Sequence, residues 1–165
     1  MKKLIFVRHS KAEEPAHEIS DFERSLTIKG KAVSKMMAIK LMEKEKSPGT
    51  MISSPAFRAL ETAIIFAVQF GIKPDKIHMD STLYYKLNYH YLSEILLSAG
   101  EDTDKITLFG HNPSFTEIAG CLSKEGSGFI PKSGIIAISF NVKTWSEVKY
   151  NTGKIEYFLK PENEL

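Results

Sequence analysis

The segment LIFVRHSKAE (residues 4–13) places four apolar residues directly before an arginine and a histidine. A short run of β-branched, aromatic and aliphatic residues is typical of a buried strand. Such a strand would end on Arg8 and His9, two side chains that are costly to bury without partners. Two interpretations follow. Either the strand simply ends at the surface, or it holds these two side chains rigidly at a reactive site.

Strand-like and helical segments alternate along the rest of the chain. Further strands are predicted at TMISS (50–54), KIHMD (76–80), KITLFGH (105–111), GIIAISF (134–140) and GKIEYFLKP (153–161), the last two as a hairpin. Helices are predicted at 28–46, at 55–70, at 91–98 and at 114–123, with Thr27 and Ser54 as N-caps of the first two and Pro55 as a first helical residue. This alternation predicts a single three-layer α/β/α domain over residues 1–165, with a mostly parallel central sheet and helices on both faces.

The composition limits the possible classes of function. The chain has 165 residues, of which 42% are hydrophobic and 25% charged, as expected for one globular domain. The net charge of +2 comes from scattered basic residues, so neither nucleic acid nor a membrane is predicted as a partner. The one cysteine, Cys121, cannot form an internal disulfide and is expected to pack in the core. No apolar run is long enough for a signal peptide or a membrane span, so we expect a soluble, cytoplasmic protein.

Three of the predicted strands end in unusual polar residues. The first ends in Arg8 and His9, the second leads into Arg58, and the fourth ends in His111. The carboxyl ends of parallel strands lie at one edge of a sheet, where ligands bind. Arg58 follows Ser54 by four residues, and helical side chains lean toward the N-terminus, so its guanidinium should project back over this edge. Two arginines, two histidines and a helix N-terminus fit a phosphate group.

Four segments together resemble the histidine phosphatase superfamily in order and spacing. They are Arg8-His9, RSLTIKG (24–30), SSPAFRALETA (53–63) and FGHNPS (109–114). VRHSKAE with GHNP is most similar to the small SixA-like phosphohistidine phosphatases. The resemblance extends over nearly the whole chain, to FLKPENEL (158–165), and implies the phosphoglycerate mutase-like fold of this superfamily with a minimal cap.

The resemblance also implies roles for individual residues. His9 would be the nucleophile that is transiently phosphorylated, Arg8 and Arg58 would clamp the phosphoryl oxygens, and His111 would bind the same group from the opposite side. Arg24 would assist beside the pocket, although Asp21 and Glu23 also offer it ordinary ion-pair partners. The further substrate-binding residues would be Arg24, Ser10 and Asn112.

Physical chemistry supports these roles independently. A nucleophilic imidazole must be neutral, and neighbouring guanidinium groups lower the pKa of a histidine. Phosphoryl transfer requires mainly positioning and charge stabilisation from the protein. The cluster would supply both, and no Cys/His spacing indicates a metal site, so neither a metal nor a cofactor is expected.

Two positions depart from the family pattern. Ser10 stands where many members have glycine, and its hydroxyl is expected to be tolerated or to contact phosphate. Members that cleave ordinary monoesters carry a carboxylic acid near the third strand, but Thr82 falls near that position here. Asp80 is a nearby substitute and Glu94 a distant one. A missing acid favours phosphohistidine, whose leaving group departs as neutral imidazole, over a sugar phosphate.

Several functions therefore remain open. The leading interpretation is a metal-independent phosphatase acting on phosphohistidine in proteins. The alternatives are a phosphatase of a small phosphorylated metabolite or nucleotide, and a phosphate-binding module without turnover; a mutase is disfavoured. Four tyrosines are expected to border the pocket or to join the core, and the sequence does not indicate an oligomeric state. These are Tyr84, Tyr85, Tyr89 and Tyr91.

Overall fold

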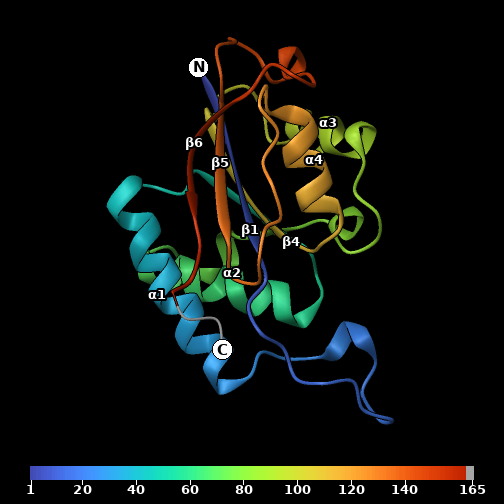
Figure 1. Ribbon diagram of the computed structural model, residues 1–165. Helices are drawn as coiled ribbons and strands as arrows, with labels where there is room; N and C mark the ends of the chain where they lie inside the picture. The colour runs from blue at the N-terminus through green and yellow to red at the C-terminus, as the bar shows by residue number, and fades with distance from the viewer. Residues whose placement is uncertain (163–165) are drawn as a thin grey trace.

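The computed structural model describes residues 1–162 and consists of a six-stranded sheet between two pairs of helices (Figure 1). The strands are β1 (Lys2–Arg8), β2 (Thr50–Ser53), β3 (His78–Met79), β4 (Lys105–Gly110), β5 (Ile135–Phe140) and β6 (Lys154–Leu159). The helices are α1 (Ile28–Lys44), α2 (Phe57–Gln69), α3 (Tyr89–Ser98) and α4 (Ser114–Leu122), with short 3-10 helices η1 (Asp21–Glu23), η2 (Pro74–Lys76), η3 (Ser81–Leu83) and η4 (Trp145–Glu147). Positions 163–165 of the predicted domain lie outside the described residues.

The sheet has the strand order β3-β2-β4-β1-β5-β6. β1 pairs in parallel with β4, and β2 pairs in parallel with both β4 and β3. β5 is antiparallel to β1, and β6 is antiparallel to β5. The mostly parallel sheet predicted from the sequence is thus confirmed. Because β1, β2 and β4 run in the same direction, their carboxyl ends meet at one edge of the sheet.

The two faces of the sheet are covered by different helices. Along β1, Leu4 and Phe6 belong to a core cluster with α3 and α4, whereas Ile5 and Val7 belong to a cluster with α1 and α2. All four side chains have 0% exposure. Side chains alternate between the faces of a strand, so this fully apolar run buries both faces of the central strand. The three-layer architecture follows directly from the segment LIFV.

The helix starts differ in how well the sequence predicts them. Thr27 caps α1 as predicted, and its side chain accepts a hydrogen bond from the Gly30 amide at 2.9 Å. The prediction for α2 is wrong, because the helix begins at Phe57 and its N-cap is Ala56. The Ser54 hydroxyl instead accepts a hydrogen bond from the Ala56 amide in the turn before the helix, at 3.2 Å.

Cys121 is exposed, contrary to the prediction that it joins the core. The side chains of α4 that pack against the sheet include Phe115, Ile118 and Leu122. Cys121 lies at the border of this apolar stripe, where the helix turns toward solvent. Within residues 1–162, no helix is both long enough and apolar enough to cross a membrane.

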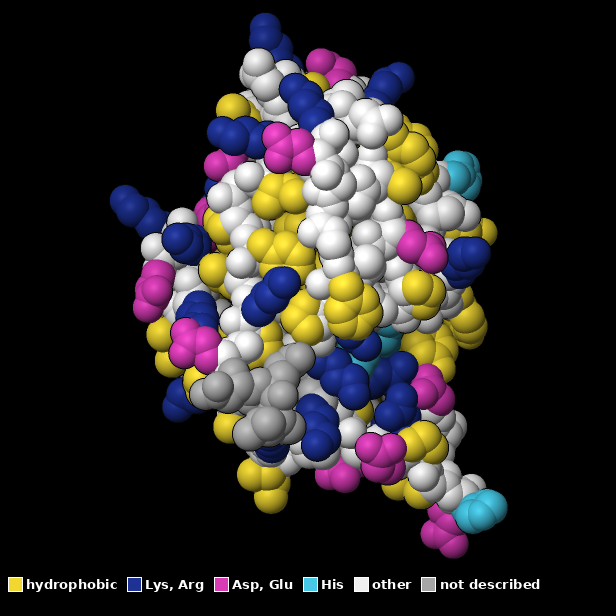
Figure 2. Space-filling view, viewed as in Figure 1, with side chains coloured by type: hydrophobic (Ala, Val, Ile, Leu, Met, Phe, Trp, Pro, Cys, Tyr) yellow, Lys and Arg dark blue, Asp and Glu magenta, His cyan; other side chains and the backbone are white. Residues whose placement is uncertain are grey.

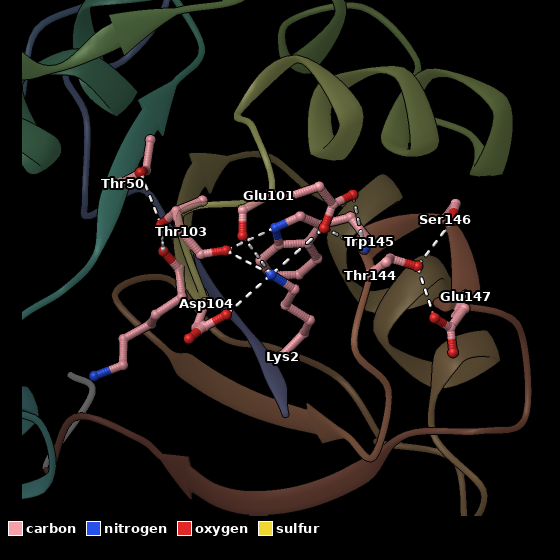
Figure 3. A network of polar contacts seen from close by, with 10 residues as sticks. Lys2, Thr50, Glu101, Thr103, Asp104, Thr144, Trp145, Ser146 and Glu147 are labelled. Atoms are coloured by element: carbon pink, nitrogen blue, oxygen red, sulfur yellow. Dashed lines mark hydrogen bonds and ion pairs between the residues drawn. The ribbon is translucent and has the colours of Figure 1, made fainter.

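The amino end of β1 holds a buried lysine in a closed set of polar contacts (Figure 3). Lys2 is 1% exposed, and its ammonium donates to the carbonyls of Glu101 and Thr103, both at 3.0 Å, and to the Asp104 carboxylate at 2.9 Å. The Trp145 ring lies 5.2 Å from the same nitrogen. All three ammonium hydrogens therefore have acceptors, which is what a buried charge requires.

Candidate active site

Four predicted site residues come together at the carboxyl edge of the sheet: Arg8, His9, Arg58 and His111. The rings of His9 and His111 have centroids 5.2 Å apart. Both arginines lie close enough for their charges to lower the pKa of both histidines. Figure 2 shows the result as a hollow in the lower half of the view, where Lys and Arg side chains gather around a histidine.

Three hydrogen bonds hold the backbone and the ring of His9 in place. Its amide donates to the Gly110 carbonyl at 3.1 Å, which ties the end of β1 to the end of β4, and its carbonyl accepts from the Ser133 amide at 3.1 Å. In the side chain, Nδ1 lies 2.8 Å from the Ser10 carbonyl. A carbonyl oxygen only accepts hydrogen bonds, so Nδ1 carries the ring proton and Nε2 keeps its lone pair. The ring is held in the tautomer that a nucleophile needs.

Both histidines are neutral at physiological pH. Burial lowers the pKa of His9 from 6.5 to about 3; the hydrogen bond to the Ser10 carbonyl opposes this shift, and the nearby His111, Arg58 and Arg8 add to it. Burial and the Arg58 charge lower the pKa of His111 from 6.5 to about 4. The imidazoles can thus offer lone pairs and N–H groups close to positive charge.

His111 is oriented by the segment that follows β2. Its Nε2 lies 2.8 Å from the Ser54 hydroxyl, so the serine predicted as a helix cap instead positions a site residue. The other ring nitrogen, Nδ1, is buried and has no hydrogen-bond partner among residues 1–162. A buried polar atom without a partner is unusual in a native protein and indicates a place for a ligand atom.

Arg58 is the second residue of α2 and is 7% exposed. One terminal nitrogen donates to the Asp21 carbonyl at 2.8 Å, and the other donates to the Asp21 carboxylate at 3.1 Å. Its Nε is buried and, within the described chain, has no partner. Arg58 is thus held by the loop before α1 while one N–H remains available.

Asp21 is the site residue that sequence reasoning missed. Its carboxylate also accepts from the Arg24 guanidinium at 2.8 Å and from the Tyr84 hydroxyl at 3.0 Å. Burial alone would raise the pKa of Asp21, but the hydrogen bonds from Arg24 and Tyr84 and the charge of Arg58 lower it to about 2. The sequence identifies Asp21 only as an ion-pair partner of Arg24, because its contact with Arg58 depends on the path of the loop.

Arg8 lies at the opposite side of the cluster. One of its terminal nitrogens donates to the Ile130 carbonyl at 3.0 Å. The guanidinium carbon lies 5.4 Å from the centre of the Phe129 ring. Arg8 thus connects the end of β1 with the loop that precedes β5.

Ser10 does not face the pocket, contrary to the prediction of a phosphate contact. Its side chain has 0% exposure and its hydroxyl is bonded to the hydroxyls of Ser34 and Ser133, the latter at 2.6 Å. The Ser10 amide donates to the Thr62 hydroxyl at 3.2 Å, and that hydroxyl donates to the Arg58 carbonyl at 2.7 Å. Ser10 therefore links the backbones of β1 and α2 behind the site.

Asn112 lines the cavity beside His111 that is described below, so its predicted substrate contact stays a prediction, and its side chain also has a structural role. Its side-chain amide donates to the Ile130 carbonyl at 2.9 Å, and its oxygen accepts from the amide and hydroxyl of Thr116 at 3.2 and 2.9 Å. Both ends of the side chain thus have at least one partner in the protein. Asn112 thus fixes the start of α4, which the cis peptide bond to Pro113 precedes.

A cavity of about 530 Å³ opens beside His111 and Arg58. Its walls include two carboxylates, Asp21 and Glu117, but neither of the substitutes predicted for the missing acid. Asp80 caps η3 by accepting from the Thr82 amide at 2.9 Å, and Glu94 on α3 pairs with His90 at 3.3 Å.

The four predicted tyrosines separate into two pairs. Tyr84 and Tyr85 line this cavity, and the Tyr84 ring lies 5.7 Å from that of His111. The Tyr89 hydroxyl instead donates to the Val148 carbonyl at 2.8 Å, and Tyr91 is 39% exposed on the same helix. Of the four tyrosines, the first pair lines this cavity and the second pair does not. Within residues 1–162, no three His, Cys, Asp or Glu side chains are grouped to hold a metal ion.

Known proteins resemble this chain in both sequence and structure. No known family model matches the sequence. An uncharacterized protein of Picosynechococcus sp. is 29% identical over 140 residues, which cover 82% of this chain and 84% of the relative.

Among solved structures, SixA of Agrobacterium tumefaciens, assigned as a phosphohistidine phosphatase, superposes with a TM-score of 0.78 at 24% identity, covering 97% of this chain and 98% of that one. The protein histidine phosphatase SixA complexed with tungstate has a TM-score of 0.79 at 20% identity, covering 96% and 97%. A mycobacterial glucosyl-3-phosphoglycerate phosphatase has a TM-score of 0.69 at 12% identity, covering 95% and 98%. The chain has the fold of the SixA-like histidine phosphatases, as the sequence predicts.

Proposed function

We propose that the chain is a member of the histidine phosphatase superfamily and a phosphatase that uses His9 as its nucleophile, with phosphohistidine in proteins as the substrate. The observation that carries this proposal is the state of His9. Its ring is neutral, its Nδ1 proton is held by the Ser10 carbonyl at 2.8 Å, and its Nε2 lone pair is left for attack beside two guanidinium groups. Such an arrangement has no evident structural purpose.

The reaction would proceed in two steps. In the first, Nε2 of His9 attacks phosphorus, a new N–P bond forms, and the N–P bond of the substrate breaks. The leaving imidazole takes one proton from solvent and departs neutral. In the second step, water attacks the phosphorylated His9, the new N–P bond breaks, and inorganic phosphate leaves while the ring recovers its Nε2 lone pair.

Charge stabilisation would come from the side chains around His9. The N–H at Arg58 Nε is buried and has no partner in the described chain, and it would donate to a phosphoryl oxygen. We assign the Ser54 hydroxyl as donor to Nε2 of His111, at 2.8 Å, so that Nδ1 carries the ring proton and donates to a second oxygen. With Arg8, these groups supply the positive charge and directed hydrogen bonds that phosphoryl transfer needs, so the proposal includes no metal.

The carboxylates of the cavity support a substrate with a good leaving group. Asp21 has a pKa of about 2 and is therefore ionised, so it has no proton to give to a leaving oxygen. Glu117 is the other carboxylate in the cavity wall and is exposed on α4. An alkoxide is a far poorer leaving group than imidazole and needs a general acid. This favours a P–N bond over a sugar phosphate.

The structural neighbours support the same chemistry. SixA binds tungstate, a tetrahedral oxyanion like phosphate, and shares its fold with this chain at a TM-score of 0.79. A small phosphorylated molecule is the second candidate substrate, because a glucosyl-3-phosphoglycerate phosphatase shares the fold at a TM-score of 0.69.

Trapping the intermediate tests the nucleophile. The protein is incubated with an aryl phosphate labelled in the phosphoryl group, quenched with denaturant and assayed for bound label. We expect label that is acid-labile and base-stable, and its loss in His9→Ala. His90→Ala is the matched control, because its exposed ring pairs with Glu94 at 3.3 Å and does not line the cavity. If the wild-type protein gives neither label nor turnover, the proposal fails and a phosphate-binding module is left.

A substrate panel tests the leaving group. We expect a phosphohistidine peptide and aryl phosphates to be hydrolysed at least about 100-fold faster, in kcat/KM, than sugar phosphates, because only the sugar phosphates need a general acid. Glu117→Gln should leave phosphohistidine turnover unchanged. Comparable rates on a sugar phosphate, or a requirement for Glu117, would contradict the proposed substrate while leaving the role of His9 in place.

A further inference from the structure

A second hollow lies on the other side of the phosphate cluster. It has a volume of about 420 Å³ and adjoins Arg8, whereas the cavity described above adjoins His111 and Arg58. We call it the basic groove and define it by Arg8, Lys11, Lys29, Phe129, Pro131 and Lys132. None of the residues on this list except Arg8 has a part in the proposed chemistry.

The charge of the basic groove is strongly one-sided. Three lysines line it together with Arg8, and the one carboxylate among its described lining residues is Glu162, which pairs with Lys40 at 3.3 Å. The ammonium groups of Lys11 and Lys132 have no hydrogen bond or ion pair with any residue in 1–162. Because Lys11 and Lys132 are cations without an anionic partner among residues 1–162, this groove favours an anionic occupant.

The basic groove also has an apolar wall. Phe129 is 64% exposed although it is a large aromatic residue, and Pro131 lies two residues further along the same loop. A neighbouring hollow of about 380 Å³ shares Phe129, Pro131 and Pro161 with the first one and is also lined by Lys160. Because the two hollows share these residues, an extended chain bound in one can continue into the other.

The walls of the basic groove are tied to the nucleophile. The Ser133 amide, next to Lys132, donates to the His9 carbonyl at 3.1 Å. On the opposite wall, the Lys11 carbonyl accepts from the Thr27 amide at 3.0 Å. A Cβ on Gly30 would lie 2.2 Å from that carbonyl, so the segment after β1 and the start of α1 pack too closely for any other residue there. The groove is therefore a preformed feature at a fixed distance from His9.

We propose that the basic groove binds an acidic segment of the substrate protein next to its phosphorylated histidine. This inference rests on the proposed function and specifies its partner. Arg8 belongs to both the phosphate cluster and the basic groove, so a phosphoryl group at His9 brings the adjoining residues of an extended chain over the lysines. Glutamate or aspartate side chains there would pair with Lys11 and Lys132, and the aliphatic parts would pack on Phe129 and Pro131.

Paired phosphohistidine peptides test the inference. One peptide carries three glutamates beside the phosphohistidine, and its partner carries glutamines at the same positions. We expect the wild-type protein to prefer the acidic peptide at least about tenfold in kcat/KM at low salt, mainly through KM, with the preference falling as salt screens the charges. In the double variant Lys11→Gln/Lys132→Gln, the preference for the acidic peptide in kcat/KM should fall to about twofold or less.

The control variant removes the same charge elsewhere. Lys143 and Lys149 are exposed and lie outside the two hollows, so Lys143→Gln with Lys149→Gln should retain the tenfold preference. If this control loses the preference equally, net charge and not the basic groove is responsible, and the inference is wrong.

The remaining outcomes separate the inference from the function on which it rests. Equal turnover of both peptides by the wild-type protein overturns the basic groove and leaves the phosphatase proposal standing. Turnover of neither peptide overturns the proposed substrate and the inference with it. If the preference arises only in a variant that ends at Glu162, the inference is again overturned.

Discussion

A buried cation lies at each end of β1, Lys2 at one end and Arg58 beside the other, and their hydrogen bonds are satisfied to different extents. At the amino end, the Lys2 ammonium has three acceptors between 2.9 and 3.0 Å and lies against Trp145 (Figure 3). At the carboxyl end, Arg58 and His111 each keep a buried nitrogen with no partner in the described chain. Arg8 and Arg58 at this end lie close to two neutral histidines, whereas Lys2 is paired with carbonyls and a carboxylate.

The difference distinguishes a structural charge from a functional one. A buried cation with all its hydrogens accepted is stable without a ligand, and removing it leaves its acceptors orphaned. A cluster of like charges with unused donors is unfavourable until an anion arrives. Hydrogen-bond satisfaction, more than burial or residue type, therefore indicates which end of the strand reacts.

The largest expected effect comes from replacing the cation of the reactive end. Arg58→Met should lower kcat/KM for aryl phosphates about 1,000-fold, because the loss of one preorganised donor costs about 10²–10³ and the loss of a full charge adds to it. The free energy of unfolding should change by about 1 kcal/mol or less, since lost hydrogen bonds to Asp21 are offset by relieved repulsion. Steady-state kinetics and urea denaturation measure the two quantities. A large loss of stability would break the comparison.

The matched substitution at the amino end of β1 should lower stability and leave activity unchanged. Lys2→Met keeps the aliphatic stem but removes three hydrogen bonds from a charged donor, so we expect a loss of about 2–3 kcal/mol in the free energy of unfolding. The value of kcat/KM should be unchanged, because the whole length of β1 separates Lys2 from His9. Reduced activity in a folded Lys2→Met protein would mean that the two ends are coupled.

The pH dependence of stability sharpens the comparison further. The pKa of His111 is lowered to about 4 in the folded protein from 6.5, so below pH 6.5 the unfolded chain binds a proton that the folded protein does not. Stability therefore falls as the pH decreases from 6.5 toward 4. His111→Gln should remove about 1 kcal/mol of the loss that the wild-type protein shows between pH 7 and pH 5.5. Urea denaturation at both pH values measures this, and an identical loss in the two proteins would contradict the buried neutral state.

The smallest effect is expected at the rim of the reactive end. Tyr85 is 75% exposed, lines the cavity and packs against Tyr84 with ring centroids 5.1 Å apart. Tyr85→Ala should raise KM about threefold for phosphohistidine peptides and aryl phosphates, whose rings can pack on it. Acetyl phosphate, which has no ring, should show no change. Equal effects on all three substrates would mean that Tyr85 only shapes the cavity.

The strands, helices and central site residues could be predicted because their signals are local. The run from Leu4 to Val7 specifies a doubly buried strand, and the parallel order then places Arg8, His9 and His111 at one edge. The position of Arg58 was predicted correctly although the start of α2 was not, because a shift of a few residues leaves the first turn at the same edge.

The parts that failed depend on contacts distant in sequence. Asp21 reaches Arg58 across 37 positions, and Ser54 reaches His111 across 57. Ser10 turns inward because Ser34 and Ser133 supply hydroxyls behind it, and neither is close in sequence. Short polar side chains form either caps, turns or long-range bonds, and only the folded chain decides among them.

Asp21 lies in the segment between β1 and α1, outside the sheet, and this position makes the site sensitive to proteolysis. The segment between β1 and α1 is joined across itself by isolated bridges such as Ala12 with Leu26 and Ala16 with Ile19, and it contributes no strand to the core. A single proteolytic nick near His17 would leave the sheet and both hydrophobic clusters assembled. The nicked protein would keep its melting temperature, but Asp21 would no longer hold the Arg58 guanidinium in place. Catalytic activity could therefore be lost without loss of the fold.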